Sequence, residues 1–130
     1  MTVTMRSCAG QVDFLAISDF LFTLYQPDNR DGNWFQPIWE YAYTHPAFDE
    51  ESAGRIGIWE DHGAIVGVAT YESRPGVAFF QVHPDYAHLK PAMLEYAEKH
   101  LPDISQDGAA CLRAYVPDFD ATLEQAAIAR

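Results

Sequence analysis

The sequence predicts an α+β domain, with helices packed against one mixed α/β sheet. Three observations support this fold class. Strand-like and helix-like segments alternate along the chain, a short glycine-containing turn joins the two clearest strands, and a helical segment separates the last two strands. A helix that connects two strands of one sheet favours a parallel crossover, whereas a tight turn requires antiparallel neighbours. We therefore expect antiparallel and parallel pairs in the same sheet.

The N-terminal segment is predicted to form a short strand and a helix. Residues 3–8 alternate enough to indicate a strand. Residues 11–25 repeat apolar side chains at helical spacing, which is typical of a helix with a broad buried face. The apolar positions of this helix are Phe14, Leu15, Ile17, Leu21, Phe22 and Leu24.

A loop and an aromatic-rich helix follow. Residues 26–33 are dominated by Pro, Asp, Asn and Gly, which is typical of a loop. Residues 34–44 are predicted to form the second helix. Its start is expected near Pro37, because proline is tolerated in the first turn of a helix. The pair His45-Pro46 is expected to end it.

The clearest local pattern is a three-stranded antiparallel meander. Residues 55–60 and 64–72 are predicted strands. Residues 61–63, Asp-His-Gly, connect them as a hairpin with glycine where a positive φ is needed. Residues 74–76, Arg-Pro-Gly, then turn the chain into a third strand at residues 77–82.

The C-terminal third supplies the remaining elements. After residues 83–86 a helix is predicted to run to about Leu101. Residues 110–116 are predicted to form the last strand, and residues 118–130 the last helix. No internal repeat or linker divides the chain, so we expect a single domain over residues 1–130.

The chain is strongly acidic. Lys and Arg number 8 against 19 Asp and Glu, and the net charge is -11. Nucleic-acid binders need clustered cations, and an anionic membrane surface would repel this chain, so we expect neither partner. We expect no signal peptide, and no segment approaches the roughly 20 apolar residues that span a bilayer. The cysteines Cys8 and Cys111 form no Cys-x-x-Cys pair, and we expect a cytoplasmic protein.

Several motifs and their order resemble one protein superfamily. Residues 79–86, Phe-Phe-Gln-Val-His-Pro-Asp-Tyr, end the meander and lead directly into a helix. This segment resembles the fourth strand and cofactor-helix entry of the GNAT superfamily of acyl-CoA N-acyltransferases. Residues 4–6 fit the opening strand of that family, and residues 59–67 resemble its second and third strands. Residues 116–130 resemble its fifth strand running into the fourth helix, so the resemblance covers nearly the whole chain.

The resemblance implies transfer of an acetyl group from acetyl-CoA to a small amine. In this family the pantetheine arm of the cofactor adds to a splayed strand through main-chain bonds, which need no particular side chain. The equivalent residues here are Phe80, Gln81 and Val82. The resemblance therefore makes these three residues the expected cofactor contacts.

The phosphate-binding loop departs from the family pattern. That pattern is Arg or Gln, two residues, Gly, one residue, then Gly or Ala, so that backbone N–H groups can approach the pyrophosphate. Residues 87–92 read Ala-His-Leu-Lys-Pro-Ala, with Lys90 in place of the first glycine and Pro91 without a donor. Lys90 near a helix start could attract an anion. The simpler interpretation is that Pro91 starts the helix and Lys90 is solvated.

The catalytic groups are also incomplete. Acetyl transfer needs a base for the amine and an acid for the leaving thiolate, and the family's acid is commonly a tyrosine on the fourth helix. This chain has no tyrosine after Val116. Tyr115 lies on the preceding strand, where a core or cross-strand role is the simpler interpretation. His83 could act as a base and Glu72 ends a strand, but a solvated side chain is the simpler interpretation of each. The histidines show no metal-ligand spacing, so we expect no metal site.

The aromatic residues of the second helix have three possible roles. In the resembling family the corresponding helix pair forms one wall of the acceptor cleft, so Trp34, Trp39 and Tyr43 are candidate cleft residues. Packing on the sheet is the simpler interpretation, because large aromatic side chains usually fill cores. An exposed patch that docks another domain is the third alternative.

Two function hypotheses follow. A complete GNAT domain continues into two further strands, which this chain apparently lacks, so it resembles the degenerate N-terminal half of a tandem GNAT protein. The first hypothesis is therefore a GNAT-type N-acetyltransferase, or the N-terminal part of one, that is weak or inactive as an isolated chain. The second is a non-catalytic GNAT-like domain that binds a ligand or supports a second GNAT domain. An unfinished sheet also exposes an edge, which makes a homodimer possible.

Overall fold

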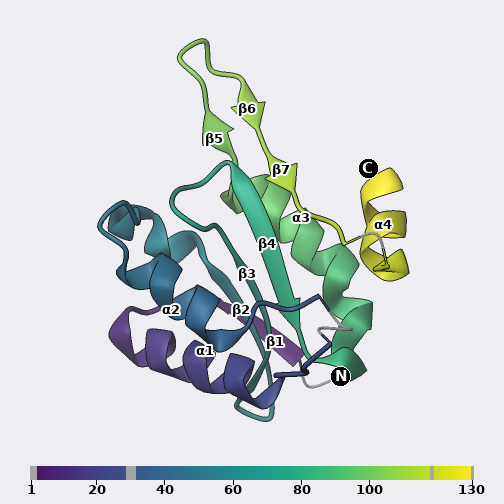
Figure 1. Ribbon diagram of the computed structural model, residues 1–130. Helices are drawn as coiled ribbons and strands as arrows, with labels where there is room; N and C mark the ends of the chain where they lie inside the picture. Colours follow the sequence, from purple (N-terminus) through teal and green to yellow (C-terminus); the bar gives the residue numbers. More distant parts are fainter. Residues whose placement is uncertain (1–2, 29–31, 118, 130) are drawn as a thin grey trace.

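The computed structural model describes residues 3–28, 32–117 and 119–129 (Figure 1). Its helices are α1 (Gln11–Thr23), α2 (Gln36–Thr44), α3 (Lys90–His100) and α4 (Ala121–Ile128), with two 3-10 segments, η1 (Glu50–Arg55) and η2 (Pro84–Leu89). Its strands are β1 (Val3–Ser7), β2 (Gly57–Asp61), β3 (Ala64–Thr70), β4 (Val77–Val82), β5 (Asp103–Ile104), β6 (Ala110–Cys111) and β7 (Arg113–Ala114).

Five strands form one mixed sheet in the order β1-β2-β3-β4-β7. Strands β1 to β4 are antiparallel neighbours, whereas β7 is parallel to β4. The chain passes through α3 between β4 and β7, so this helix carries the parallel crossover. The predicted α+β fold class with a mixed sheet is confirmed.

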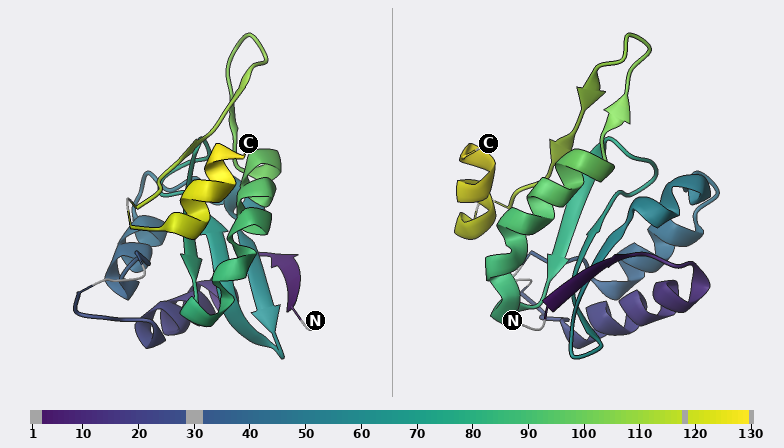
Figure 2. Two further views of the ribbon diagram at one scale, coloured as in Figure 1. Left: turned by 90° about the vertical axis from the view of Figure 1, so that its right-hand side faces the viewer. Right: turned by 180° about the vertical axis from the view of Figure 1, so that it is seen from behind.

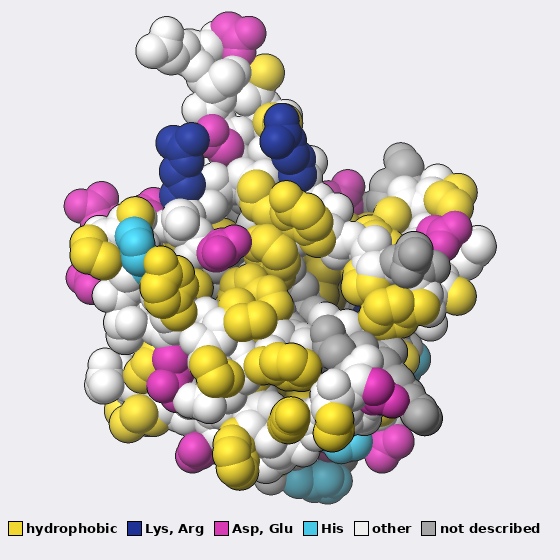
Figure 3. Space-filling view, viewed as in Figure 1, with side chains coloured by type: hydrophobic (Ala, Val, Ile, Leu, Met, Phe, Trp, Pro, Cys, Tyr) yellow, Lys and Arg dark blue, Asp and Glu magenta, His cyan; other side chains and the backbone are white. Residues whose placement is uncertain are grey.

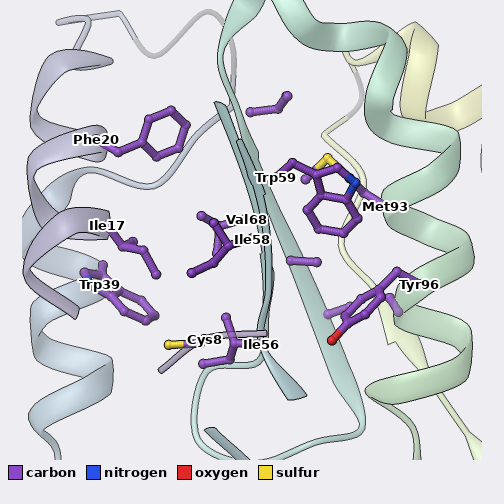
Figure 4. Close-up of a cluster of buried hydrophobic side chains, with 14 of the residues drawn as sticks. Cys8, Ile17, Phe20, Trp39, Ile56, Ile58, Trp59, Val68, Met93 and Tyr96 are labelled. Carbon is purple, nitrogen blue, oxygen red and sulfur yellow. The ribbon is translucent and has the colours of Figure 1, made fainter. Parts of the chain in front are cut away.

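Helices cover both faces of the sheet. α1 and α2 lie on one face and α3 lies on the other, with α4 beside α3 (Figure 2). Successive residues of a strand point to opposite faces, and Figure 4 shows Ile58 pointing toward α1 and the adjacent Trp59 pointing toward α3. The sheet therefore has a hydrophobic core on each side. None of the helices within the described ranges is long and apolar enough to cross a membrane.

At two glycines a side chain would be strained or would clash with a neighbour. In the β2–β3 turn His62 and Gly63 have φ values of 52° and 79°, as hairpin turns of this hand require. The predicted positive φ at Gly63 is confirmed. At Gly57 a Cβ atom would lie 2.7 Å from the ring of Tyr96. That ring packs edge-on against Trp59, and its hydroxyl donates a hydrogen bond to the Arg55 carbonyl at 2.7 Å.

The predicted strand over residues 110–116 is wrong in its extent. Residues of β6 pair with β5 in a separate hairpin that projects from the sheet (Figure 1), and those of β7 pair with β4. The hairpin turn is stabilised locally, because Asp107 accepts a hydrogen bond from the Ala109 N–H at 3.0 Å and Gly108 has a φ of 85°. Leu112 lies between the two short strands, where the chain leaves one sheet for the other.

Several other boundaries differ from the prediction, among them the ends of α1 at Thr23 and of β3 at Thr70. β2 begins at Gly57 because the 3-10 segment η1 extends to Arg55. The helix predicted directly after residue 86 is preceded by η2, so α3 begins at Lys90, with proline in its first turn as predicted. The last helix begins at Ala121, while Asp118 and Arg130, the predicted limits, lie outside the described residues.

A charged cluster joins β1 to α1 and β2. The Arg6 guanidinium donates to both carboxylate oxygens of Asp13 at 2.7 and 2.8 Å, and it lies 3.1 Å from Glu60. Asp13 also accepts the Ala9 N–H at 2.6 Å, in the first turn of α1. The hydrogen bonds from Arg6 hold the pKa of the Asp13 carboxyl below its usual range. This cluster fixes the start of α1 on the sheet.

The Asp13 cluster makes the stability of the fold depend on pH. A carboxyl with a lowered folded-state pKa stabilises the fold above its unfolded pKa of about 3.9, and this contribution disappears as the pH falls through the folded value. We expect Asp13→Asn to cost about 1–2 kcal/mol at pH 7, a modest value because the Arg6 side chain is 39% exposed. Urea denaturation at a series of pH values checks this. An equal difference between the two proteins at neutral pH and below pH 3 would contradict the role of the charge.

Candidate functional site

The candidate site is a cleft where β4 and β7 part. The two strands pair at Val77 with Arg113 and at Ala78 with Ala114, and the last bond runs from the Tyr115 N–H to the Ala78 carbonyl at 3.3 Å. Beyond this bond the two segments diverge and leave a cavity of about 290 Å³. Figure 3 shows a large apolar surface at the centre of this face. We call this cavity the β4–β7 cleft; its lining residues are Gly32, Asn33, Trp34, Phe79, Phe80, Gln81, Lys90, Tyr115, Val116, Pro117, Asp120 and Leu123.

Asn33 binds the edge of β4 inside this cleft. Its side-chain nitrogen donates to the Val82 carbonyl at 2.8 Å, and its side-chain oxygen accepts the Val82 N–H at 2.8 Å. Both residues are buried. The carboxamide therefore pairs with the strand as a neighbouring peptide group would, and it satisfies both main-chain groups of Val82. An extended ligand in the cleft therefore cannot form main-chain hydrogen bonds with Val82.

Among the described residues, Phe80 presents the remaining open segment of the β4 edge. The His83 N–H bonds to the Val66 carbonyl of the neighbouring strand at 2.9 Å, so alternate residues of β4 face away from β3. The peptide groups of Val82 and Phe80 are among those that face away from β3. The β4–β7 ladder stops at Ala78 and does not reach them. The peptide groups of Phe80 consequently face the β4–β7 cleft, between β7 and the Asn33 side chain.

The buried Gln81 side chain holds the segment before α2 in place. It is 2% exposed, and its amide oxygen accepts the Trp34 N–H at 2.5 Å. Together with Asn33, this bond fixes the segment before α2 against β4. Of the three expected cofactor contacts, Phe80, Gln81 and Val82, the first alone retains main-chain groups that face the cleft.

Lys90 is buried and paired, so the expectation of a solvated side chain is wrong. Its Nζ atom lies 2.6 Å from Asp120 Oδ2, and the two side chains are 11% and 8% exposed. The packing of α4 beside α3 brings the carboxylate over the first turn of α3. Asp120 Oδ1 also accepts the Leu123 N–H at 3.0 Å and caps α4. The charge of Lys90 is thus already neutralised within the protein.

The Lys90–Asp120 ion pair separates two cavities. Both residues line the β4–β7 cleft, and both also line a second cavity of about 340 Å³ near the start of α3. Ala87 and Pro84 of η2 border this second cavity. A ligand that extended from one cavity to the other along β4 would have to pass the ion pair.

The structure separates the three aromatic candidates. Trp34 lines the β4–β7 cleft, where its ring lies 4.8 Å from that of Phe79. Trp39 is 1% exposed in the core, and Tyr43 stacks on Phe14 at 4.7 Å. The candidate cleft of Trp34, Trp39 and Tyr43 is therefore not formed, and the simpler interpretation, packing in the core, holds for Trp39 and Tyr43.

The three candidate catalytic residues also lie apart. His83 caps η2, where its Nδ1 atom accepts the Asp85 N–H at 3.1 Å. Glu72 is exposed in the loop after β3. Tyr115 borders the β4–β7 cleft with 63% of its surface exposed, and its ring stacks on Phe79 at 5.0 Å. Tyr115 alone of the three lines this cleft, and its cross-strand contact was the simpler of its predicted roles.

Sequence reasoning missed Asn33 and Asp120 as site residues. Asn33 ends a loop rich in turn-forming residues. Because its partner, Val82 on β4, is distant in the chain, no local sequence pattern indicates the contact. Asp120 precedes a helical segment and has the side chain of a typical N-cap, which would have indicated the true start of α4. Within the described ranges no three His, Cys, Asp or Glu side chains gather as metal ligands.

Comparison with known proteins adds no relative to this description. No model of a known protein family matches the chain, and no curated protein matches it.

Proposed function

We propose that this chain is a GNAT-type domain, the N-terminal part of an N-acetyltransferase, which holds acetyl-CoA weakly or not at all as an isolated chain. The parting of β4 and β7 carries the proposal. Two parallel strands that pair over two residues and then diverge leave the Phe80 peptide groups open to an extended, amide-containing ligand such as a pantetheine arm. The expected substrate is a small amine.

The side chains of the cleft support a weak or inactive domain. Asn33 occupies both main-chain groups of Val82, and Asp120 neutralises Lys90. An amine that attacks the thioester must lose a proton to a base, and the departing thiolate must gain one from an acid. Of the candidate groups, Tyr115 alone borders the cleft, and the carboxylate of Asp120, which also lines it, is engaged by Lys90. Transfer by this chain would therefore proceed without a complete acid–base pair.

Calorimetric titration with acetyl-CoA tests this proposal. We expect no detectable heat from the wild-type chain up to millimolar cofactor. Asn33→Ala is expected to bind measurably, because it frees the N–H and carbonyl of Val82, and to cost about 1–3 kcal/mol of stability for the same reason. Asn33→Asp, which keeps an acceptor for the Val82 N–H, is the matched control and should bind less than Asn33→Ala.

The outcomes of this titration are distinct. Micromolar binding by the wild type would show that the β4–β7 cleft is open to acetyl-CoA. It would favour the hypothesis of an active acetyltransferase. Binding by neither the wild type nor a folded Asn33→Ala variant would remove acetyl-CoA as the ligand and favour the non-catalytic alternative.

One observation favours that alternative as a second candidate function. α1 and α2 carry large apolar side chains that are exposed on the outer side of the helix pair, and exposed apolar surfaces of this kind often dock other proteins. These residues are Val12, Leu15, Phe22, Ile38 and Tyr41. In this alternative the chain supports a second GNAT domain, or a second copy of itself, without binding acetyl-CoA.

A further inference from the structure

A second cleft lies at the beginning of β4, at the opposite end of the strand from Lys90. It is bounded by the turn between β3 and β4 and by residues of β5, β6 and β7, and it has a volume of about 430 Å³, within the usual range for small-molecule sites. It shares Phe79 and Tyr115 with the β4–β7 cleft. We call it the arginine cleft; its lining residues are Glu72, Ser73, Arg74, Pro75, Gly76, Val77, Phe79, Asp103, Cys111, Arg113 and Tyr115.

Two arginines border this cleft without an ion-pair partner. Arg74 and Arg113 are exposed, and neither forms a salt bridge within the described part of the chain. By contrast, Arg6, Lys90 and Lys99 each have a carboxylate partner. The chain has 19 acidic residues and 8 basic ones, and two of its described arginines lie unpaired at this one cleft. Figure 3 shows two groups of basic side chains above the central apolar surface, on either side of the base of the projecting hairpin.

The cleft also has an aromatic wall. The rings of Phe79 and Tyr115 stack at 5.0 Å with an angle of 9° between their planes. Tyr115 is 63% exposed, so one part of this pair stays open to a ligand. Exposed, pre-stacked rings favour a flat apolar or aromatic group, which gains contact area without ordering new side chains.

Acidic and basic groups around the cleft are balanced. Glu72 and Asp103 line it together with the two arginines, and neither acid forms an ion pair in the described structure. A simple anion such as phosphate would gain from the guanidinium groups but would be repelled by the carboxylates. A zwitterion can satisfy both kinds of group, since guanidinium groups bind carboxylates in a bidentate geometry and carboxylates accept hydrogen bonds from ammonium groups.

We propose that the arginine cleft binds a zwitterionic amino acid with an aromatic or large apolar side chain. Arg74 and Arg113 hold its carboxylate, Glu72 or Asp103 accepts its ammonium group, and its side chain lies on the ring of Tyr115. This site does not depend on acetyl-CoA, because the Asn33 and Lys90 contacts that close the β4–β7 cleft lie at the other end of β4.

Amide NMR spectra of the isotope-labelled chain test this site, with L-phenylalanine as the probe. We expect saturable shifts confined to residues 72–79 and 111–115. The double variant Arg74→Gln/Arg113→Gln is expected to weaken the apparent affinity by about tenfold or more. Arg55→Gln is the matched control, with unchanged affinity, because Arg55 is exposed, lies outside the cleft and forms no ion pair with another described residue. The unaffected amides of each spectrum show that the variant is folded.

Two further probes separate the parts of the ligand. Phenylpropanoate lacks the ammonium group and phenylethylamine lacks the carboxylate, so both should bind more weakly than L-phenylalanine. Equal shifts with phenylethylamine, or shifts that persist in the double variant, would overturn the role of the arginines. Equal or stronger binding of phenylpropanoate would overturn a zwitterionic ligand, and the absence of shifts at residues 72–79 and 111–115 would overturn the site.

Discussion

Replacement of Trp39 with alanine is expected to destabilise the fold by about 3–5 kcal/mol. The Trp39 side chain is 1% exposed between α1, α2 and the sheet, and its ring lies 6.0 Å from that of Phe14 and 5.3 Å from that of Tyr43. Its indole N–H also donates to the Phe14 carbonyl at 3.2 Å. Truncation would leave a large cavity and remove this hydrogen bond, although the Phe14 carbonyl would still accept the Ser18 hydroxyl. Urea denaturation with a fitted midpoint and slope measures the change.

Tyr41→Ala is the matched control on the same helix. The Tyr41 side chain is 67% exposed, and its loss is expected to change the stability by no more than about 0.5 kcal/mol. A cost below about 1 kcal/mol for Trp39→Ala would contradict a core position. In that case Trp39 would return as a candidate for the wall of a ligand cleft.

Lys90→Met is expected to cost about 3 kcal/mol, because it leaves the buried carboxylate of Asp120 without its cation. That carboxylate also caps α4, so we expect the loss to appear first as local opening of this helix. For a chain of this size the change corresponds to a fall in Tm of about 10 °C. Thermal denaturation measures the global effect, and amide hydrogen exchange measures the opening of residues 121–128.

Lys99→Met is the control for the loss of a lysine from α3. Lys99 lies 3.3 Å from Glu95, but the two side chains are 67% and 53% exposed. Exposed pairs of this kind contribute about 0.5 kcal/mol or less. Equal effects of Lys90→Met and Lys99→Met would show that Lys90 is solvated, as the loop sequence alone suggested, and available for an anionic ligand.

These two substitutions also separate what the loop sequence can indicate from what it cannot. The proline in the first turn of α3 was predictable, because the restriction on its φ acts within the residue itself. The environment of Lys90 was not, because its partner Asp120 is 30 residues away and reaches it through the packing of α4 on α3. For Trp39, by contrast, packing on the sheet was the simpler interpretation of the sequence, and its burial agrees with it.

Most of the fold was determined by patterns within short segments. The β2–β3 hairpin follows from a turn that needs positive φ, and β4 has the bounds that the apolar run of residues 77–82 predicted. The mixed sheet followed from the order of elements, because a crossover through a helix favours a parallel pair. The predicted last strand failed because residues 110–114 divide between two partners, β5 and β4.

The candidate site was decided by tertiary structure. The sequence by itself identified the strand that carries Phe80 and the proline in the first turn of the helix that follows it. Only the folded chain brings Asn33 to Val82, 49 residues away, and places Arg74 and Arg113 around one cleft. Periodicity and turn chemistry act between near neighbours in the chain, so they predict elements. A cleft depends on contacts between elements, and no local pattern records which side chain of a loop binds the free edge of a strand.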